Sequence, residues 1–304
     1  MAPKRHESLW FSSGDVVLST NIYLFKVHKE LLALQSSVFK DMFELEQPVE
    51  GVQGIVQELY EGLPLVALVG DEGKDVAHLL KAVYYRDYYD RDNDKTPLEI
   101  IVALLVLGNK YDFKHIQSDV MKQLLRLYPN TLDGFDDVDQ GGYDCNLFGV
   151  HRVKSDFKLL EACHTANVAV LLPILYYACS EFTVEWIYEQ VDEVGGLHAS
   201  CLRTLLTGKC KLSLALRTLV AFLPDEFSNI SCSSCKAGAS VRHLHHQHGS
   251  HLWTYKGQDL AQSVLKDGCK QCTANLATRI DEKREEIWEK IPSFFGFAGW
   301  DELQ

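Results

Sequence analysis

Residues 25–43, FKVHKELLALQSSVFKDMF, constrain the fold most, because apolar side chains recur there at spacings of three and four. The recurring residues are Leu31, Leu32, Leu34, Val38, Phe39, Met42 and Phe43. This period is typical of helices that bury one face, and Ser36-Ser37 offers a side-chain cap where one short helix ends and another begins. Two apolar runs come first, residues 16–18 and 22–25, and the polar residues between them predict a two-stranded hairpin.

Three further segments continue this pattern. Residues 63–70, LPLVALVG, predict a strand that ends in a Gly-Asp turn, and residues 75–85, DVAHLLKAVYY, predict an amphipathic helix. Residues 97–129 predict a helical pair, in which Leu104, Leu105, Leu107 and Tyr111 face inward. In this order, the segments over residues 8–130 resemble a BTB/POZ domain. The resemblance implies an α+β fold, a small mixed sheet flanked by helices, and a non-catalytic protein–protein interaction module that forms homodimers.

The same resemblance implies a partner or dimer pocket. In many BTB domains, an acidic residue at the start of the first strand faces a basic residue just after a histidine that opens a helix. Asp15, Lys29 and His28 occupy these positions here. Two alternatives remain open: Asp15 as a capping or strand-edge carboxylate, and His28 as a helix-opening residue whose ring bonds the local backbone.

The resemblance also admits an adaptor of cullin-type ubiquitin ligases or a transcription-associated scaffold. A cullin adaptor needs a hydrophobic-x-Glu element in the loop after Phe43, and the loop here, residues 44–62, is longer than typical. The triplets Met42-Phe43-Glu44 and Leu59-Tyr60-Glu61 fit that element only at displaced positions. The cullin scaffold therefore stays an alternative partner.

Composition favours a cytoplasmic or nuclear binding protein. The formal net charge of −12 argues against a nucleic-acid or anionic-membrane surface, because such partners need clustered Lys and Arg. The most apolar runs, residues 100–107 and 168–179, are too short to span a bilayer, and the N-terminus has no apolar signal core. Nine cysteines, several within helical patterns, suit reduced thiols better than a disulfide framework.

The chain changes character after the BTB-like region. Residues 131–155 are acidic and Gly-rich, and we expect a linker or an ordered loop there. Residues 156–304 regain the helical period and predict a mostly α-helical C-terminal domain. Within it, Pro173 predicts a break near Leu171-Leu172, and Gly208 is expected to end a helix.

Two CxxC pairs, Cys232/Cys235 and Cys269/Cys272, are the strongest candidates for inorganic chemistry. Each spacing lets two thiolates face one ion, and two pairs complete the tetrahedron that structural zinc prefers. Because the pairs are far apart in the sequence, a folded insertion has to bring them together. The alternatives are two unrelated cysteine pairs and, with less support, a redox-active CxxC, for which a thioredoxin-like strand–helix context is missing.

The histidine-rich segment between the pairs offers a competing metal set. It contains His243, His245, His246, His248 and His251. The separation of Cys235 from His248 suits a two-Cys two-His finger, but His248 and His251 are too close together and the apolar residues of a finger are missing. A solvated polar loop is the favoured interpretation, and a histidine replacing one cysteine ligand stays open.

The end of the chain carries a second resemblance. Cys269 and Cys272, a charged helix, and then Trp288, Pro292, Phe295, Gly296 and Trp300 resemble the C-terminal signature of a basidiomycete BTB protein family. The same residues predict a docked apolar tail, because burying each ring contributes a few kcal/mol, on the order of 2–3. No GxSxG, HExxH or phosphate-binding glycine loop is present, and adjacent Cys163 and His164 point to different sides of a helix. We therefore expect no enzyme.

Overall fold

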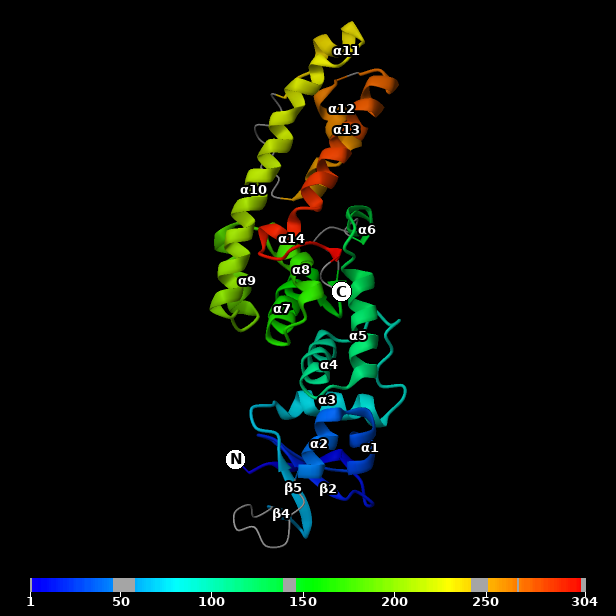
Figure 1. Cartoon of the computed structure of the whole chain (residues 1–304), viewed down its shortest axis with the longest axis vertical. Coiled ribbons are helices and arrows are strands. Elements are labelled where there is room, and N and C mark those ends of the chain that lie inside the picture. Colours follow the sequence, from blue (N-terminus) through cyan, green and yellow to red (C-terminus); the bar gives the residue numbers. More distant parts are fainter. Residues whose placement is uncertain (1, 46–57, 139–145, 242–250, 267, 302–304) are drawn as a thin grey trace. The chain divides into compact units, whose positions relative to one another are not determined.

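A computed structural model describes residues 2–45, 58–138, 146–241, 251–266 and 268–301 (Figure 1). The chain divides into two compact units. The first holds residues 1–126 and 146–155, and the second holds residues 127–145 and 156–304. The predicted fold class is confirmed, because a mixed five-stranded sheet with helices forms the first unit and the second is mostly helical.

The sheet of the first unit has the strand order β1-β3-β2-β5-β4. Its strands are β1 (Lys4–Trp10), β2 (Val16–Ser19), β3 (Tyr23–Val27), β4 (Leu59–Tyr60) and β5 (Leu63–Ala67). The pairs β1–β3 and β2–β5 are parallel, whereas β2–β3 and β4–β5 are antiparallel. The predicted hairpin is therefore present as β2–β3, with Val16 opposite Val27 and Ser19 opposite Leu24.

Helices follow in the order that the periodicity predicts: α1, α2 and α3 lie near the strands in Figure 1, and α4 packs against α3. They are α1 (Lys29–Gln35), α2 (Ser37–Leu45), α3 (Gly73–Tyr84), α4 (Leu98–Lys110) and α5 (Lys114–Leu127). Ser36 separates α1 from α2 as predicted, since its Oγ accepts the Phe39 N–H at 3.0 Å and donates to the Tyr111 carbonyl. Fully buried side chains from all layers form the core: Val17, Phe25, Leu32, Phe39, Leu80, Leu104 and Val120.

The prediction that Leu34 belongs to the buried stripe is wrong. Leu32 is fully buried, whereas Leu34 is 81% exposed. Two residues along a helix correspond to about 200°, so one short helix cannot turn both side chains toward the same core. Because α1 has only two turns, Leu34 faces solvent.

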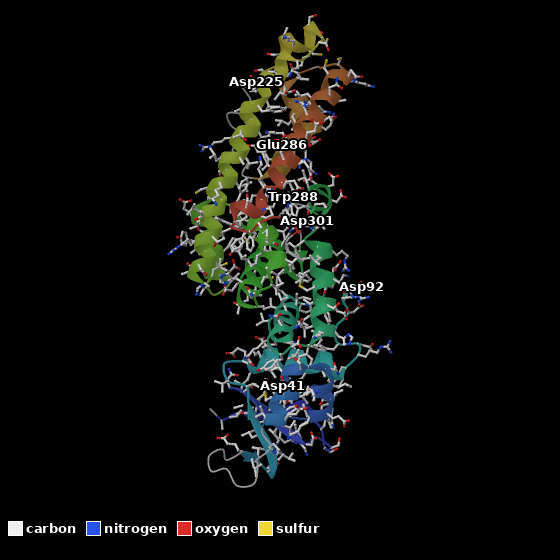
Figure 2. All side chains as sticks on the ribbon, viewed as in Figure 1. Asp41, Asp92, Asp225, Glu286, Trp288 and Asp301 are labelled. Carbon is white, nitrogen blue, oxygen red and sulfur yellow. The ribbon has the colours of Figure 1, made fainter. Side chains whose placement is uncertain are left out.

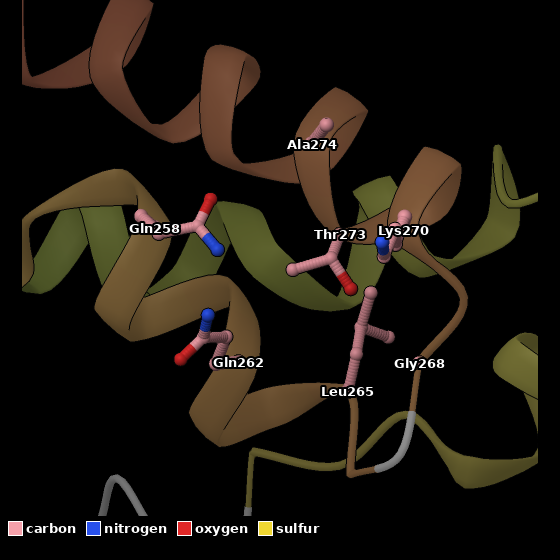
Figure 3. A pocket seen from close by; sticks show the side chains of 7 residues that line it. All are labelled: Gln258, Gln262, Leu265, Gly268, Lys270, Thr273 and Ala274. Carbon is pink, nitrogen blue, oxygen red and sulfur yellow. The ribbon is translucent and has the colours of Figure 1, made fainter.

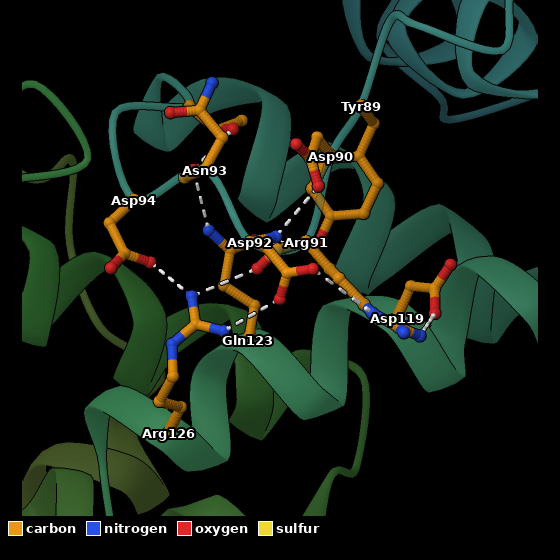
Figure 4. A network of polar contacts seen from close by, with 10 residues as sticks. Tyr89, Asp90, Arg91, Asp92, Asn93, Asp94, Asp119, Gln123 and Arg126 are labelled. Atoms are coloured by element: carbon orange, nitrogen blue, oxygen red, sulfur yellow. Dashed lines mark hydrogen bonds and ion pairs between the residues drawn. The ribbon is translucent and has the colours of Figure 1, made fainter.

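An aspartate-rich segment between α3 and α4 is fastened to α5 (Figure 4). Arg126 of α5 forms ion pairs with Asp94 at 2.5 Å and with Asp92 at 3.3 Å. A second contact to α5 is the ion pair of Arg91 with Asp119 at 2.7 Å. These carboxylates are thus engaged by arginines in a structural clamp.

Residues 131–155, expected as a linker or ordered loop, contain defined elements on both sides of the undescribed residues 139–145. Helix α6 (Leu132–Val138) belongs to the second unit. The short hairpin of β6 (Asn146–Leu147) and β7 (Val150–His151) belongs to the first. Its Phe148 carbonyl accepts the Leu98 N–H at 3.0 Å at the start of α4.

The second unit is built from helices of very different length (Figure 1). Besides α6, they are α7 (Arg152–Thr165), of which residues 156–165 belong to this unit, the 3-10 helix η2 (Ala169–Leu171), α8 (Leu172–Cys179), α9 (Val184–Glu193), α10 (Ala199–Ser228), α11 (Ser233–Gly238), the 3-10 helix η4 (Leu252–Tyr255), α12 (Gly257–Val264), α13 (Lys270–Trp288) and α14 (Ile291–Phe294). The predicted break before Pro173 is confirmed, because η2 ends at Leu171 and α8 begins at Leu172. Proline is tolerated in a first helical turn, where its missing N–H has no intrahelical partner.

The expectation that Gly208 ends a helix is wrong. The helix α10 continues through Gly208 to Ser228 and lies alongside α13 in Figure 1. A Cβ atom on Gly208 would stand 2.0 Å from Cδ1 of Phe295. The glycine is therefore explained by the close approach of an aromatic ring rather than by a helix terminus.

The predicted docking of the C-terminal tail is confirmed up to residue 301. Trp288 (Figure 2) is fully buried, and its Nε1 donates to the Asn130 carbonyl at 2.8 Å. Trp300 stacks on Trp288 with ring centroids 5.4 Å apart and donates to the Trp288 carbonyl at 3.1 Å. Among the described residues, no helix combines the length and the apolar character needed to cross a bilayer.

Candidate functional sites

The four predicted metal ligands come together in the second unit. The Sγ atoms of Cys232, Cys235, Cys269 and Cys272 all lie within 4.8 Å of one another. Cys235 and Cys272 are buried, Cys232 is half-buried and Cys269 is exposed. The four cysteines can therefore hold a metal ion, as the sequence predicts.

Both pairs owe their geometry to the same local structure. Cys232 is the N-cap of α11 and Cys269 is the N-cap of α13. Their partners, Cys235 and Cys272, occupy the third helical position. Residues three positions apart at the start of a helix lie on the same side of it. A CxxC sequence at the start of a helix therefore turns both sulfur atoms toward one point.

The segment between the pairs folds back and joins them, as their separation requires. Just after α11, Ala239 forms an isolated antiparallel bridge with Leu265, and the Ser240 N–H donates to the Val264 carbonyl at 3.0 Å. The Cys269 N–H then donates to Cys235 Sγ at 3.2 Å, which links the two helix starts directly. The second pair is thus held against the first by main-chain contacts.

The helix α12 fixes the position of α13. The Gly257 N–H at the start of α12 donates to the Asp281 carboxylate at 2.9 Å. A Cβ atom on Gly257 would lie 2.3 Å from the Ala277 carbonyl oxygen, so only glycine allows this approach. A pocket of about 310 Å³ lies between α12 and the start of α13, lined by polar side chains that include Gln258, Gln262 and Thr273 (Figure 3).

The four thiols titrate differently within each pair. A hydrogen bond with Ser234, 3.1 Å from Sγ, and the backbone N–H of Cys235 lower the pKa of Cys232 to about 6. The backbone N–H of Cys272 likewise lowers the pKa of Cys269. The hydrogen bond with Cys269, together with burial, raises the pKa of Cys272 to about 11. The pKa of Cys235 is also raised: the Cys269 N–H lowers it, but the hydrogen bond with Cys232 and burial outweigh that effect.

One lowered and one raised pKa in each pair is the result expected when thiols are in contact. Four thiolates repel one another, so protons shared within each pair keep the negative charge low. A divalent cation would replace those protons and accept all four sulfur atoms as ligands. At a Zn–S distance of about 2.3 Å, tetrahedral ligands stand about 3.8 Å apart, so the cluster fits zinc after closing by about 1 Å at most.

The histidines do not contribute a ligand among the described residues. The four cysteines form the cluster by themselves, and His243, His245, His246 and His248 lie outside the residues that the structure describes. His251 is described and buried: its ring lies 4.2 Å from that of Tyr177, and its Nε2 is 3.9 Å from the Glu181 carboxylate. The two-Cys two-His combination that includes His251 is therefore not assembled.

The residues expected to form the partner pocket meet at the start of α1 in the first unit. Asp15 Oδ1 accepts the Lys29 backbone N–H at 2.8 Å, which is the capping contact considered above. The Lys29 ammonium lies 5.6 Å from the centroid of the Phe43 ring. His28 is held by Ser13 at 2.9 Å and by Tyr84 at 3.1 Å, through its two ring nitrogens. The contacts of His28 are thus to side chains rather than to local backbone.

Neither cullin-type triplet gains support from its position. Phe43 is buried, so the Met42-Phe43-Glu44 triplet does not present its aromatic side chain. In the second triplet, Glu61 pairs with Arg5, and Tyr60 packs on Trp10 at 6.1 Å. Residues 46–57 of the long loop lie outside the described residues.

One contributor to the four-cysteine site was missed by the sequence analysis. Ser234 bonds Cys232, and the serine inside the CxxC spacing was the available signal. Leu34 was assigned to the core, although its position two residues after Leu32 could have placed it on the opposite face.

The eight cysteines among the described residues are free thiols, and Cys163 is buried with its pKa raised by burial.

No protein-family model matches the chain, and a search of curated proteins gives no match.

Proposed function

We propose that this chain is a non-catalytic protein-interaction protein of the BTB/POZ type, in which the first unit self-associates. Two features support the proposal. Residues 8–130 resemble that family, and the order of elements that the resemblance implies is present: a hairpin, two short helices, a strand, a helix and a helical pair. Such a module works through a surface rather than through a catalytic centre.

The observation that carries the proposal is the exposure of Leu34. This side chain is 81% exposed on α1, the helix that begins where Asp15 and Lys29 meet. Leu31, one turn earlier on the same side, is half-buried. A single exposed leucine is ordinary on a protein surface. Here it lies on the helix that begins at the site that the resemblance assigns to dimer contacts, and a second copy would cover it.

Sedimentation velocity of the full chain over a wide range of concentrations tests self-association. We expect a dimer for the wild type and a monomer for Leu34→Asp, because an interfacial charge without a partner opposes association. Leu214→Asp is the matched control, since Leu214 is an exposed leucine of the second unit. A monomeric wild type, or a dimer that Leu34→Asp leaves intact, would refute self-association through α1.

We further propose that the four cysteines hold one structural zinc ion. Four protein ligands leave no position for substrate, so the ion would crosslink the starts of α11 and α13 and supply no catalysis. Reduced thiols throughout the described residues support a cytoplasmic or nuclear location, where disulfides are rare. Metal analysis of the purified chain tests the zinc proposal: about one zinc per chain is expected from the ligand set, and none after Cys235→Ser/Cys272→Ser.

A further inference from the structure

The second unit carries a surface groove that neither site uses. It has a volume of about 490 Å³ and lies between the start of α9 and one face of α10. The lining is mostly apolar, and its residues are Val184, Leu206, Lys209, Cys210, Ser213, Leu214 and Arg217. We call it the α9–α10 groove. It lies wholly within one compact unit.

The groove exposes apolar side chains in a helical register. Leu206, Cys210 and Leu214 follow one another at intervals of four residues, so they form a line along α10. Leu214 is 65% exposed and Val184 is 44% exposed, although both are large aliphatic side chains. The line covers about 12 Å of helix, which matches two turns of a second helix packed against it.

The charged side chains that line the groove, Lys209 and Arg217, are both cationic, and Glu181 lies near enough to Lys209 to act on it electrostatically. Between residues 199 and 224, α10 contains Arg203, Lys209, Lys211 and Arg217 but no aspartate or glutamate, in a chain of net charge −12. Lys209 donates to the Ser180 carbonyl at 2.8 Å. Within the described part of the chain, Arg203 and Arg217 form no ion pair. The groove therefore combines an apolar floor with one cation, Arg217, that forms no ion pair among the described residues.

We propose that the α9–α10 groove binds an acidic amphipathic helix of a partner protein. The apolar side chains of that helix, at intervals of three and four, would cover Leu206, Cys210 and Leu214. Its carboxylates would face Arg217, which fixes the direction of the helix and speeds its association. This inference does not depend on self-association or on zinc binding.

The probe is a random peptide library displayed on phage and selected against the purified full chain. We expect enriched peptides with acidic residues beside helically spaced apolar ones. For a synthetic peptide of the enriched sequence, fluorescence anisotropy should show that Leu214→Asp weakens binding at least about tenfold, or about 1.4 kcal/mol. Arg217→Glu should weaken it by a similar factor, and replacing the facing peptide carboxylate with lysine should restore the affinity.

Two controls separate this proposal from the others. Lys211→Glu reverses a charge on the same helix outside the groove lining, and Leu34→Asp removes the exposed leucine of the first unit. Both should leave peptide affinity unchanged. Failure to enrich any peptide beyond the level seen with Leu214→Asp would overturn the proposal. So would enriched peptides without acidic residues, or binding that neither groove variant weakens. Sedimentation of the same variants reports self-association independently.

Discussion

The ring of Phe295 lies directly against the backbone of Gly208, in the middle of the longest described helix. Phe295 is buried and stacks on Tyr176, with ring centroids 5.3 Å apart and planes within 12° of each other. The ring is therefore fixed on both sides. A side chain on residue 208 has no space unless the C-terminal tail moves.

Gly208→Ala should lower the free energy of unfolding by about 1–3 kcal/mol, the usual cost of overpacking a buried site. Helix propensity alone would favour alanine by about 1 kcal/mol, so the two effects have opposite signs. Urea denaturation measures the change. In a Phe295→Ala background the cost of Gly208→Ala should disappear, and an equal cost in both backgrounds would contradict the contact.

Replacement of Arg284 should strongly destabilise the second unit. It is 4% exposed and pairs with Asp136 at 2.7 Å and Asp281 at 2.9 Å, while its Nε donates to the Leu252 carbonyl at 3.1 Å. Arg284→Met should cost about 3–5 kcal/mol, because Asp136 would lose the partner of its charge. Arg284→Lys should recover only part of this, since an ammonium cannot make the same fork of bonds. If urea denaturation gives Arg284→Lys the same free energy of unfolding as the wild type, this role of Arg284 is contradicted.

Asp15 should act as a cap for α1. Its carboxylate accepts the Lys29 N–H, so Asp15→Ala should lower the free energy of unfolding by about 1 kcal/mol, whereas Asp15→Asn keeps an acceptor and should cost less. Asp41→Ala is the matched control, because Asp41 is an exposed carboxylate of α2 without a hydrogen bond to another described residue. Equal effects of Asp15→Ala and Asp41→Ala in chemical denaturation would argue against the cap.

The first unit should lose stability in mild acid through His78. Burial, and then the charge of Lys81, lower the pKa of this histidine, which lies 2.5 Å from the Tyr88 hydroxyl. Because the folded pKa is below the unfolded value of about 6.5, the unfolded chain binds the proton first. At high pH His78 is neutral in both the folded and the unfolded chain and does not affect stability. As the pH drops below about 6.5, the unfolded chain gains a proton first, and the free energy of unfolding falls.

His78→Gln should reduce this pH sensitivity while leaving the contribution of other groups in place. Urea midpoints of wild type and variant at about pH 7.5 and about pH 5.5, on either side of the ordinary histidine pKa, give the double difference. A wild-type midpoint that falls no more than that of the variant would contradict the prediction.

Local patterns predicted most of the first unit but not its exposed leucine. The hairpin, the Ser36 break and the inward face of α4 follow from turn residues and helical period, which act over a few positions. The prediction for Leu34 was wrong because an apolar residue in a short helix need not face the core.

Long-range contacts explain the remaining differences. Gly208 was misassigned because Phe295, far along the chain, decides its role. The four cysteines were predicted from residue type and spacing, but their shared N-cap geometry and the bridge between Ala239 and Leu265 required the structure. The sequence contained a signal for the α9–α10 groove that the sequence analysis did not use. It is a long helical segment rich in cations and free of carboxylates.

The four-cysteine site should stabilise the second unit through its metal ion. If it holds zinc, removal of the metal should loosen the crosslink between α11 and α13 and lower the thermal midpoint, because the ion binds the assembled cysteine cluster more tightly than the unfolded chain. Ser234→Ala, which removes the hydrogen bond to Cys232 but no ligand, should retain the metal. Loss of metal in that variant would assign the serine a larger role than the geometry gives it.

X-ray absorption at the zinc edge of the purified full chain tests the central claim most directly. We expect one ion per chain with four sulfur neighbours at about 2.3 Å and no nitrogen or oxygen ligand. A first shell containing nitrogen, or a protein that keeps no metal while its four thiols stay reduced, would contradict it.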